Sequence, residues 1–427
     1  MGDSDSALGL VVVGYGYWGP NIVRNALERP ELELLALCEL DAGKARDFSR
    51  RYPGIPTSAD FDALLEDPRV DAVAIATPPS THFRLVEQAL EAGKHVLVEK
   101  PLATTVAEGE ALVELAEREG LVLMPGHTFL YSPPVNKVRD LIAQGELGEI
   151  FFVTSSRMNL GIYQSDGVVC DLAPHDLSIL LYWLERPVSL VAASGCTVFQ
   201  EGVPETAFLT ICFEEGCTAN VQISWLAPRK VRQMVLVGSK RMVHYDDTAS
   251  DDVVRVYDRG FDFAQPANFG EYQLSYRSGD MIAPRIQAAE PLSLELEDFA
   301  LAITTGRRPR SHAGLGLEIV RVLEAAEASL RLHGQPVIVE RERDGDDRAA
   351  YLGDPGGLIG HHVGENGNGN SGRSLATPSG NGHVGPNGQA GGDGHPNHNG
   401  RPGTNGRVGD NGHIEEEPEA RAAPDGP

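Results

Sequence analysis

The stretch LGLVVVGYGYWGPNI, residues 8–22, decides the fold of the N-terminal part of the chain. The apolar run at 8–13 indicates a buried strand. It leads directly into Gly14, Gly16 and Gly19, which satisfy the pattern G-x-G-x-x-G. Gly14 permits a tight turn, Gly16 lets the backbone approach a pyrophosphate, and Gly19 lets the next helix pack on the strand. The pattern alone also fits a plain strand-to-helix turn, so its context decides.

The residues that follow the glycine turn favour dinucleotide binding. A helix is expected at 21–28, and Glu39 comes after a second apolar run, LELLALC at 32–38. A carboxylate at that place accepts hydrogen bonds from both ribose hydroxyls and repels a 2′-phosphate. The cofactor is therefore expected to be NAD rather than NADP. Asp41 either shares this role or caps the helix expected at 42–48.

Further apolar runs alternate with segments of helical period, as a doubly wound parallel sheet requires. Thr105 with Glu108 forms a capping box, and Gly93 and Gly120 fall where helices should end. Such a sheet binds its ligand at the carboxyl ends of its strands. The runs are DAVAIAT at 71–77, HVLVE at 95–99 and LVLM at 121–124.

Composition limits the partners. The 427 residues, 41% hydrophobic, suffice for two packed domains. With 61 acidic and 36 basic residues the net charge is -25, so neither nucleic acid nor a membrane surface is an expected partner. The acidic opening and the absence of a long apolar run favour a cytoplasmic location. The odd set of five cysteines, without C-x-x-C spacing, favours reduced thiols and no metal site.

The segment 344–427 consists of Gly, Asn, His and Pro in short repeats such as GENGNGN. It holds too few apolar side chains to offset the entropy of ordering, so we expect a disordered tail.

Four ordered motifs point to a family. These are GYGYWGP at 14–20, ATPPSTH at 76–82, VEKPL at 98–102 and DLAPHD at 171–176. In this order and spacing the chain resembles, over roughly its first 340 residues, the glucose-fructose oxidoreductase, inositol dehydrogenase and MocA family.

The resemblance implies an α/β protein with two domains. Residues 1–128 would form a Rossmann domain, and residues 129–343 an α/β domain with a large, open, mostly antiparallel sheet that commonly builds homodimers or homotetramers. The sequence agrees, because apolar runs with period-two alternation follow Gly148. Two helices, at 295–303 and 316–332, and a last strand, PVIVE, come after them.

Three residues are expected to carry the chemistry. Breaking a carbinol C–H bond requires a proton to move at the oxygen, so a tunable acid or base must lie beside it. The resemblance places Lys100 at the reacting carbon, with Asp171 and His175 opposite. Asp171 would orient His175 from the preceding turn of a helix that starts near Pro174. The structural alternatives are that Lys100 is an ordinary surface lysine and that Asp171 and His175 form a buried pair that caps the start of a helix.

The resemblance also implies a cofactor loop and a sugar pocket. Thr77, Pro78 and His82 would lie beneath the cofactor, with Glu99 beside Lys100; His82 otherwise satisfies backbone groups at a helix start. Tyr17 and Trp18 would cover the pyrophosphate, reach the substrate or fill a seam between domains. The residues expected to face the sugar are His127, Tyr131, Arg157 and Asn159. The cations Arg229, Lys230 and Arg232 would meet a diphosphate or end a solvated strand.

The sequences of these motifs are most similar to those of the sugar-nucleotide branch of the family, whose enzymes oxidise UDP-N-acetylglucosamine or its uronic acid at C3. Two positions depart from the pattern of the family. Glu39 stands where aspartate is usual. No arginine precedes Tyr131, and this second departure counts against inositol or free glucose as the substrate. The alternatives are an NADPH-dependent ketoreductase of a deoxysugar nucleotide, an inositol or polyol dehydrogenase, and a dinucleotide-binding regulator without turnover. The regulator would be expected to have a broken set of lysine, aspartate and histidine, and here the set is intact.

Overall fold

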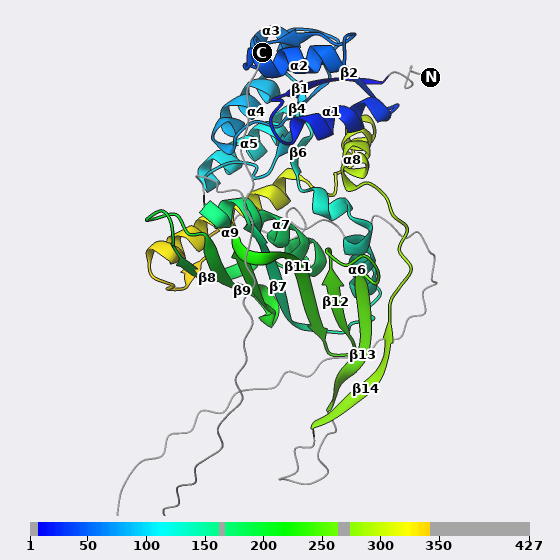
Figure 1. The fold of residues 1–427 in the computed structure, drawn as a ribbon, viewed down its shortest axis with the longest axis vertical. Coiled ribbons are helices and arrows are strands. Elements are labelled where there is room, and N and C mark those ends of the chain that lie inside the picture. Colours follow the sequence, from blue (N-terminus) through cyan, green and yellow to red (C-terminus); the bar gives the residue numbers. More distant parts are fainter. Residues whose placement is uncertain (1–6, 162–166, 264–273, 342–427) are drawn as a thin grey trace, which may run out of the picture. The chain divides into compact units, whose positions relative to one another are not determined.

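The computed structural model describes residues 7–161, 167–263 and 274–341 (Figure 1). Two sheets organise this part of the chain, one of six strands and one of nine. The predicted disordered tail, 344–427, lies outside the described residues.

The first sheet is parallel, with strand order β3-β2-β1-β4-β5-β6, the order of a dinucleotide-binding fold. The predicted doubly wound sheet is confirmed, and only the two-residue β3 had no sequence signal. Its strands are β1 (Leu8–Val13), β2 (Leu32–Cys38), β3 (Thr57–Ser58), β4 (Ala72–Ile75), β5 (His95–Glu99) and β6 (Leu123–Gly126).

Helices flank this sheet and end where the sequence signals them. The Thr105 side chain accepts a hydrogen bond from the Glu108 N–H at the start of α5, and Gly120 ends α5 with φ of 67°. The left-handed conformation at that position suits glycine. The helices are α1 (Gly19–Glu28), α2 (Ala42–Arg51), α3 (Phe61–Leu65), α4 (His82–Glu91) and α5 (Val106–Glu119), with the short 3-10 turn η1 (Pro79–Thr81).

The second sheet is mostly antiparallel, with strand order β14-β13-β12-β11-β7-β10-β9-β8-β15. β7 and β10 form its parallel pair among the described strands. The strands are β7 (Ile150–Leu160), β8 (Val188–Cys196), β9 (Thr206–Phe213), β10 (Thr218–Ser224), β11 (Leu226–Gly238), β12 (Met242–Asp246), β13 (Val254–Phe263), β14 (Leu274–Ile282) and β15 (Val337–Ile338). The predicted architecture of the second sheet is therefore confirmed.

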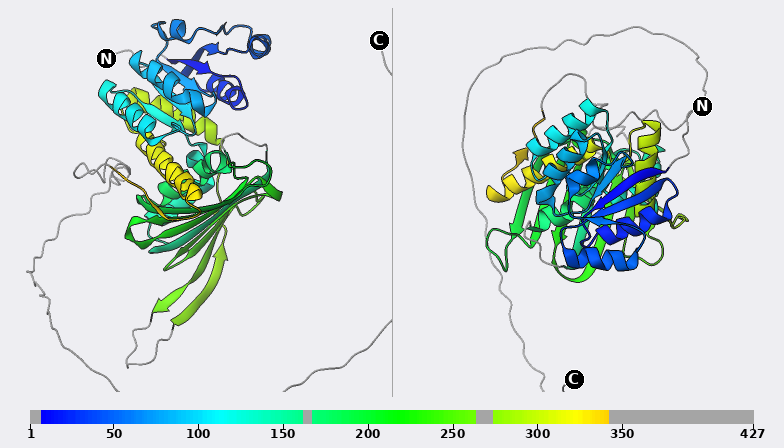
Figure 2. Two further views of the ribbon diagram at one scale, coloured as in Figure 1. Left: turned by 90° about the vertical axis from the view of Figure 1, so that its left-hand side faces the viewer. Right: turned by 90° about the horizontal axis from the view of Figure 1, so that it is seen from above.

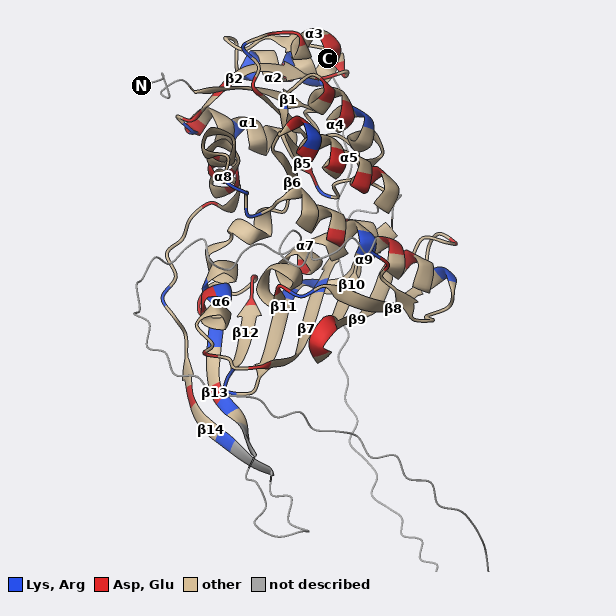
Figure 3. Cartoon of the chain, turned by 180° about the vertical axis from the view of Figure 1, so that it is seen from behind, with Lys and Arg blue, Asp and Glu red and all other residues tan. Residues whose placement is uncertain are grey.

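One face of the second sheet is covered by helices (Figure 2), and exposed apolar side chains lie on its central strands. α6 (Pro133–Ala143) and α7 (Gly167–Leu184) pack on the covered face, where Trp183 and Tyr245 meet edge to face. β9 and β10 carry no charged residue, and Figure 3 shows few charges along β7. Phe152 and Phe208 are 44% and 46% exposed.

The chain returns to the first sheet after β14. α8 (Pro291–Thr305) begins beside α1, where Glu290 accepts a hydrogen bond from the Asn25 amide. α9 (Ala313–Arg331) contributes Leu317 and Val320 to the core of the first sheet. α8 and α9 thus tie the polypeptide after β14 to the dinucleotide-binding fold.

The start of α7 corrects a sequence expectation. Pro174 was expected in the first turn, but the helix already begins at Gly167, so Pro174 lies inside it. The apolar residues before Pro174, Val168 and Val169, are fully buried and extend the helix against the core. Asp171 and His175 still lie one turn apart, but they do not cap a helix start.

The described residues include no helix with the length and apolarity needed to cross a membrane.

Candidate active site

A cavity of about 1670 Å³ lies at the carboxyl ends of β1, β2, β4 and β5 and extends to α7 and β11. That volume exceeds the usual size of a pocket for one small ligand and accommodates a dinucleotide with a second molecule. The predicted site residues that line it are Gly14, Gly16, Tyr17, Trp18, Glu39, Thr77, Pro78, Glu99, Lys100, Asp171 and His175.

The glycine turn has the geometry that a pyrophosphate requires. Gly14 adopts φ of +93°, and a Cβ there would lie 2.7 Å from the Ala76 carbonyl oxygen. A Cβ on Gly19 would lie 2.2 Å from the Gly14 oxygen, so this glycine lets α1 pack closely. A Cβ on Gly16 would meet nothing within 4 Å, because Gly16 faces the open cavity.

Two further observations fit a dinucleotide at this turn. No side chain caps the N-terminus of α1, where Pro20 has no N–H and the Asn21 N–H already donates to the Trp18 oxygen, so an anion there would meet the positive end of the helix dipole. The indole Nε1 of Trp18 is buried at the cavity without a hydrogen-bond partner in the described part of the chain. A bound cofactor would bring negative charge to the helix end and an acceptor to the indole, and its nicotinamide would accept or donate the hydride.

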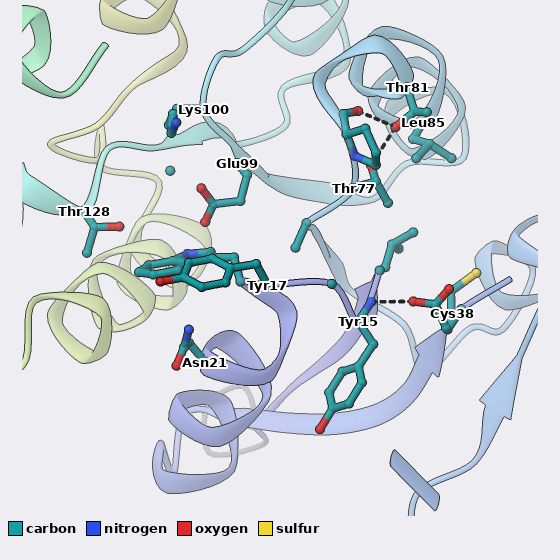
Figure 4. Close-up of a pocket in the computed structure, with 18 of the residues that line it drawn as sticks. Tyr15, Tyr17, Asn21, Cys38, Thr77, Thr81, Leu85, Glu99, Lys100 and Thr128 are labelled. Atoms are coloured by element: carbon teal, nitrogen blue, oxygen red, sulfur yellow. Dashed lines mark hydrogen bonds between the residues drawn. The ribbon is translucent and has the colours of Figure 1, made fainter. Parts of the chain in front are cut away.

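Glu39 lies at the end of β2, as predicted, and its carboxylate already holds two backbone groups. Its Oε2 accepts from the Tyr15 N–H at 2.6 Å (Figure 4), and its Oε1 accepts from the Asp41 N–H at 2.8 Å. The Asp41 side chain instead accepts from the Gly43 N–H at 2.7 Å and does not line the cavity. Asp41 therefore acts as the cap of α2, and the backbone hydrogen bonds lower its pKa.

The buried side chain of His82 packs against the loop that follows β4. His82 is fully buried, and its ring nitrogens lie 2.8 Å from the Pro101 oxygen and 3.0 Å from the Thr77 oxygen. The prediction that His82 contacts the cofactor is therefore not supported, because both nitrogens are occupied by backbone groups. Thr77 belongs to the same loop, and its hydroxyl lies 2.7 Å from that of Thr81 (Figure 4).

Lys100 and Asp171 meet across the cavity. The Lys100 Nζ donates to the Asp171 backbone oxygen at 3.0 Å and lies 3.4 Å from Asp171 Oδ1. Asp171 Oδ2 accepts from the Trp225 indole at 3.0 Å. Asp171 was expected to orient His175, but its carboxylate holds Lys100 and Trp225 instead.

His175 lies one turn further along α7, with its ring edge-on to Phe129 at a centroid distance of 5.3 Å. Burial, followed by the positive charges of Lys100 and Arg157, places its pKa well below the ordinary value. The imidazole is therefore neutral near pH 7 and able to accept a hydrogen bond.

Two residues predicted to face the sugar are buried behind the cavity wall. The Tyr131 hydroxyl donates to Asp298 at 2.7 Å, and the ring is 1% exposed. Arg157 is 4% exposed and forms two hydrogen bonds with Asp176, at 2.6 and 3.3 Å. Neither lines the cavity, because internal carboxylates hold both side chains.

His127 and Asn159 also lie outside the cavity lining. His127 is 1% exposed, and neither ring nitrogen has a partner in the described residues. Burial, with a smaller effect of Lys100, lowers its pKa to about 3. The Asn159 oxygen is likewise buried without a partner among these residues.

The cavity wall contains residues that the motifs did not reveal. Arg232 pairs with Asp247 at 3.1 Å, and its guanidinium lies 5.5 Å from the centre of the Phe129 ring. The sequence offered Arg232 only as one of three clustered cations. Thr128 also lines the cavity and donates to the buried Glu295 at 2.7 Å. No sequence pattern links Thr128 to Glu295, because α8 approaches from far along the chain.

Within the described ranges there is no cluster of three His, Cys, Asp or Glu side chains able to hold a metal ion. The thiols of Cys38, Cys170, Cys196, Cys212 and Cys217 are free of disulfides.

The fold and the cavity agree with the comparisons to known families. Residues 8–127 match the family described as an oxidoreductase family with an NAD-binding Rossmann fold. Residues 135–244 match the GFO/IDH/MocA C-terminal domain. The chain belongs to the glucose-fructose oxidoreductase, inositol dehydrogenase and MocA family, and it is an NAD-binding sugar oxidoreductase of that family.

Several relatives are named for reactions of sugar nucleotides or inositols. The UDP-N-acetylglucosamine 3-dehydrogenase of Acidithiobacillus ferrooxidans is 32% identical over 218 residues, which are 49% of this chain and 63% of that enzyme. Its solved structure aligns with TM-score 0.65 at 24% identity, covering 79% of this chain and 100% of the other, and this likeness concerns the fold.

Two other relatives have different substrates in their names. The scyllo-inositol 2-dehydrogenase (NAD(+)) of Bacillus subtilis is 27% identical over 319 residues, 71% of this chain and 87% of the relative. The dTDP-3,4-didehydro-2,6-dideoxy-alpha-D-glucose 3-reductase of Saccharopolyspora spinosa is 31% identical over 204 residues, 45% of this chain and 60% of the relative.

Proposed function

We propose that the protein oxidises a ring carbinol of a nucleotide sugar, at C3 of UDP-N-acetylglucosamine or of its uronic acid, with NAD as the hydride acceptor. The observation that supports this reaction is that Lys100, directly after β5, and His175 of α7 line the same cavity as the glycine turn. The kinship with a UDP-N-acetylglucosamine 3-dehydrogenase supports the substrate class.

The two side chains divide the work at the carbinol oxygen. The Lys100 Nζ is directed by the Asp171 backbone oxygen at 3.0 Å, and as a free amine it takes the carbinol proton when the C–H bond breaks and returns that proton in the reverse direction. His175 is neutral because burial disfavours its charged form, so its one ring N–H donates to the carbinol oxygen and leaves the hydroxyl proton for Lys100. A strongly lowered pKa makes His175 a poor proton store, which is why we assign proton exchange to Lys100.

The preference for NAD rests on Glu39. Its carboxylate lines the cavity at the end of β2, where it would accept from the ribose hydroxyls and repel a 2′-phosphate. Lys44 and Arg84 line the same cavity, so the test compares NAD and NADP side by side.

A second candidate is reduction of a deoxysugar nucleotide with NADPH, which the 31% identical 3-reductase favours. An inositol or polyol substrate is the third, with the 27% identical inositol dehydrogenase as its support. A regulator without turnover is disfavoured, since Lys100, Asp171 and His175 all line the cavity. The cytoplasmic location, the homodimer or homotetramer and the domain limits 1–128 and 129–343 stay predictions.

The test is a spectrophotometric screen of purified protein with NAD or NADP against UDP-sugars, inositols and free hexoses. We expect reduced nicotinamide to accumulate only with NAD and UDP-N-acetylglucosamine or its uronic acid. Reduction with inositols alone would overturn the substrate class, and oxidation of NADPH by a keto-deoxysugar nucleotide would establish the second candidate instead.

A further inference from the structure

Two carboxyl groups interact in the interior, and one of them adjoins Lys100. Glu99 is the last residue of β5 and lines the cavity, and its carboxyl points into it (Figure 4). The glycine at position 126 leaves room for this group, because a Cβ there would lie 3.2 Å from Glu99 Oε1. Glu295 reaches the same region from α8 and is 1% exposed. Burial raises the pKa of Glu99 to about 8, and burial together with the Glu99 charge raises that of Glu295 well above its ordinary value.

Thr128 connects Glu295 to the cavity. Its hydroxyl lies 2.7 Å from Glu295 Oε2 and lines the cavity wall. The other oxygen, Glu295 Oε1, is buried without a partner in the described residues. An ionised carboxylate in that position would be costly, so Glu295 is the member of the pair that stays protonated.

In the described part of the chain, Lys100 is the one cation that shifts the pKa of either carboxyl. Lys100 adjoins Glu99 and favours its ionised form, whereas Asp298 on α8 raises the pKa of Glu295 further. Asp298 itself is held by Tyr131 and by Arg307. From α7, the Asp171 carboxylate lies toward Lys100, and the neutral His175 adds no charge. The neutral His127 lies between β6 and α6.

We propose that Glu99 holds a proton in the free enzyme and releases it when oxidised nicotinamide binds, so that the enzyme couples NAD⁺ binding to proton release at the Glu99–Glu295 pair. The inference rests on the proposed place of the nicotinamide beside Lys100.

The direction of the coupling follows from charge. The cationic ring of NAD⁺ stabilises a carboxylate beside it, so it binds the ionised form of Glu99 more tightly. The affinity for NAD⁺ therefore rises as pH rises toward 8 and then levels. The reduced ring of NADH carries no positive charge, so its affinity does not follow Glu99 in this way.

The test measures cofactor binding and needs no turnover. Calorimetric titration of the full chain with NAD⁺ and with NADH, in two buffers of different ionisation enthalpy, yields the dissociation constant and the protons released. Between pH 6.5 and 8.5 we expect the NAD⁺ dissociation constant to fall about tenfold with release of a proton, as single-site linkage allows. The NADH dissociation constant should change little.

Three variants identify the group. Glu99→Gln should abolish the proton release and flatten the NAD⁺ profile. Glu295→Gln, which keeps a neutral hydrogen-bonding side chain, should retain both. Glu205→Gln is the matched control, because Glu205 is also 1% exposed but accepts backbone N–H groups away from the cavity.

Each other outcome overturns the inference. Proton release that persists in Glu99→Gln would assign it to another group, Lys100 first. NAD⁺ binding without proton release in the native chain would refute the coupling and leave the proposed function standing. If neither NAD⁺ nor NADH bound, both the coupling and the proposed function would be refuted.

Discussion

The Lys100 amine is directed by a neighbouring helix rather than by its own strand. Its Nζ donates to the Asp171 backbone oxygen at 3.0 Å, and the Asp171 carboxylate is itself held by the Trp225 indole at 3.0 Å. The lysine therefore has a fixed direction across the cavity before any ligand arrives. Preformed direction of this kind reduces the entropy lost when the substrate is aligned.

Replacing the amine should remove proton exchange and leave the glycine turn intact. We expect Lys100→Met to bind NAD⁺ and to lower kcat at least ~100-fold, the usual scale of a lost general acid or base. Steady-state kinetics and calorimetry measure the two quantities. Lys240→Met is the control, because Lys240 is exposed outside the cavity. An unchanged kcat would remove Lys100 from the mechanism.

The charge of Glu39 should determine the cofactor. Glu39→Gln keeps an oxygen for one of the two backbone N–H groups and loses the negative charge, so it should bind NAD⁺ more weakly and tolerate a 2′-phosphate. We expect the ratio of the NAD⁺ and NADP⁺ dissociation constants to shift toward NADP⁺ by about tenfold, the scale of a charged hydrogen bond. Equal weakening of both cofactors would argue against ribose recognition by Glu39.

Sequence could locate the motif residues but not every contact they make. Gly14, Gly16 and Lys100 follow strands whose apolar pattern is plain, so their place at the cavity was predictable. Glu295 and Asp247 had no local signal, because their positions depend on how distant elements pack. Arg157 and Tyr131 were misplaced, because their internal partners, Asp176 and Asp298, come from other segments of the chain.

At the scale of elements, a buried ion pair fixes α7 to the second sheet. Arg157 of β7 and Asp176 of α7 have side chains that are 5% and 3% exposed, and Ser155 also donates to Asp176. α7 carries both Asp171 and His175, so this pair links the helix of the catalytic side chains to the sheet. The sequence predicted the strand and the helix but not this link.

Breaking that pair should affect stability before substrate affinity. Removing one partner of a buried ion pair leaves an uncompensated charge, so Arg157→Met should lower the free energy of unfolding by about 3 kcal/mol. Urea unfolding measures the loss, and the KM for the sugar substrate should remain unchanged. Arg241→Met is the control, since its pair with Glu146 is partly exposed and should cost at most about 1 kcal/mol. A raised KM in Arg157→Met with native stability would restore Arg157 to the substrate site.

At the scale of the described fold, several histidines are buried in uncharged form. Burial is the largest influence on His82, His127, His175 and His312, and it lowers the pKa of each. An unfolded chain binds protons at these positions below about pH 6.5, whereas the folded chain binds them at lower pH. The free energy of unfolding therefore falls as the pH drops below that value.

The acid sensitivity can be assigned to single residues. The pKa of His127 is about 3 in the folded chain, so between pH 7 and pH 5 this residue alone should lower the free energy of unfolding by about 2 kcal/mol. His127→Leu should reduce the loss by that amount in urea unfolding at the two pH values. The exposed His333, with φ of 56°, provides the control His333→Asn, because asparagine tolerates that conformation. An unchanged pH dependence in His127→Leu would contradict a neutral buried imidazole.

A crystal structure of the protein with NAD⁺ and UDP-N-acetylglucosamine tests the central claim most directly. The account predicts the pyrophosphate at Gly16, the adenosine ribose at Glu39, and the nicotinamide ring beside the sugar carbinol. It also predicts that the carbinol oxygen lies about 3 Å from both Lys100 Nζ and a His175 ring nitrogen, within hydrogen-bond reach. A dinucleotide bound elsewhere, or a sugar held away from these two side chains, would contradict it.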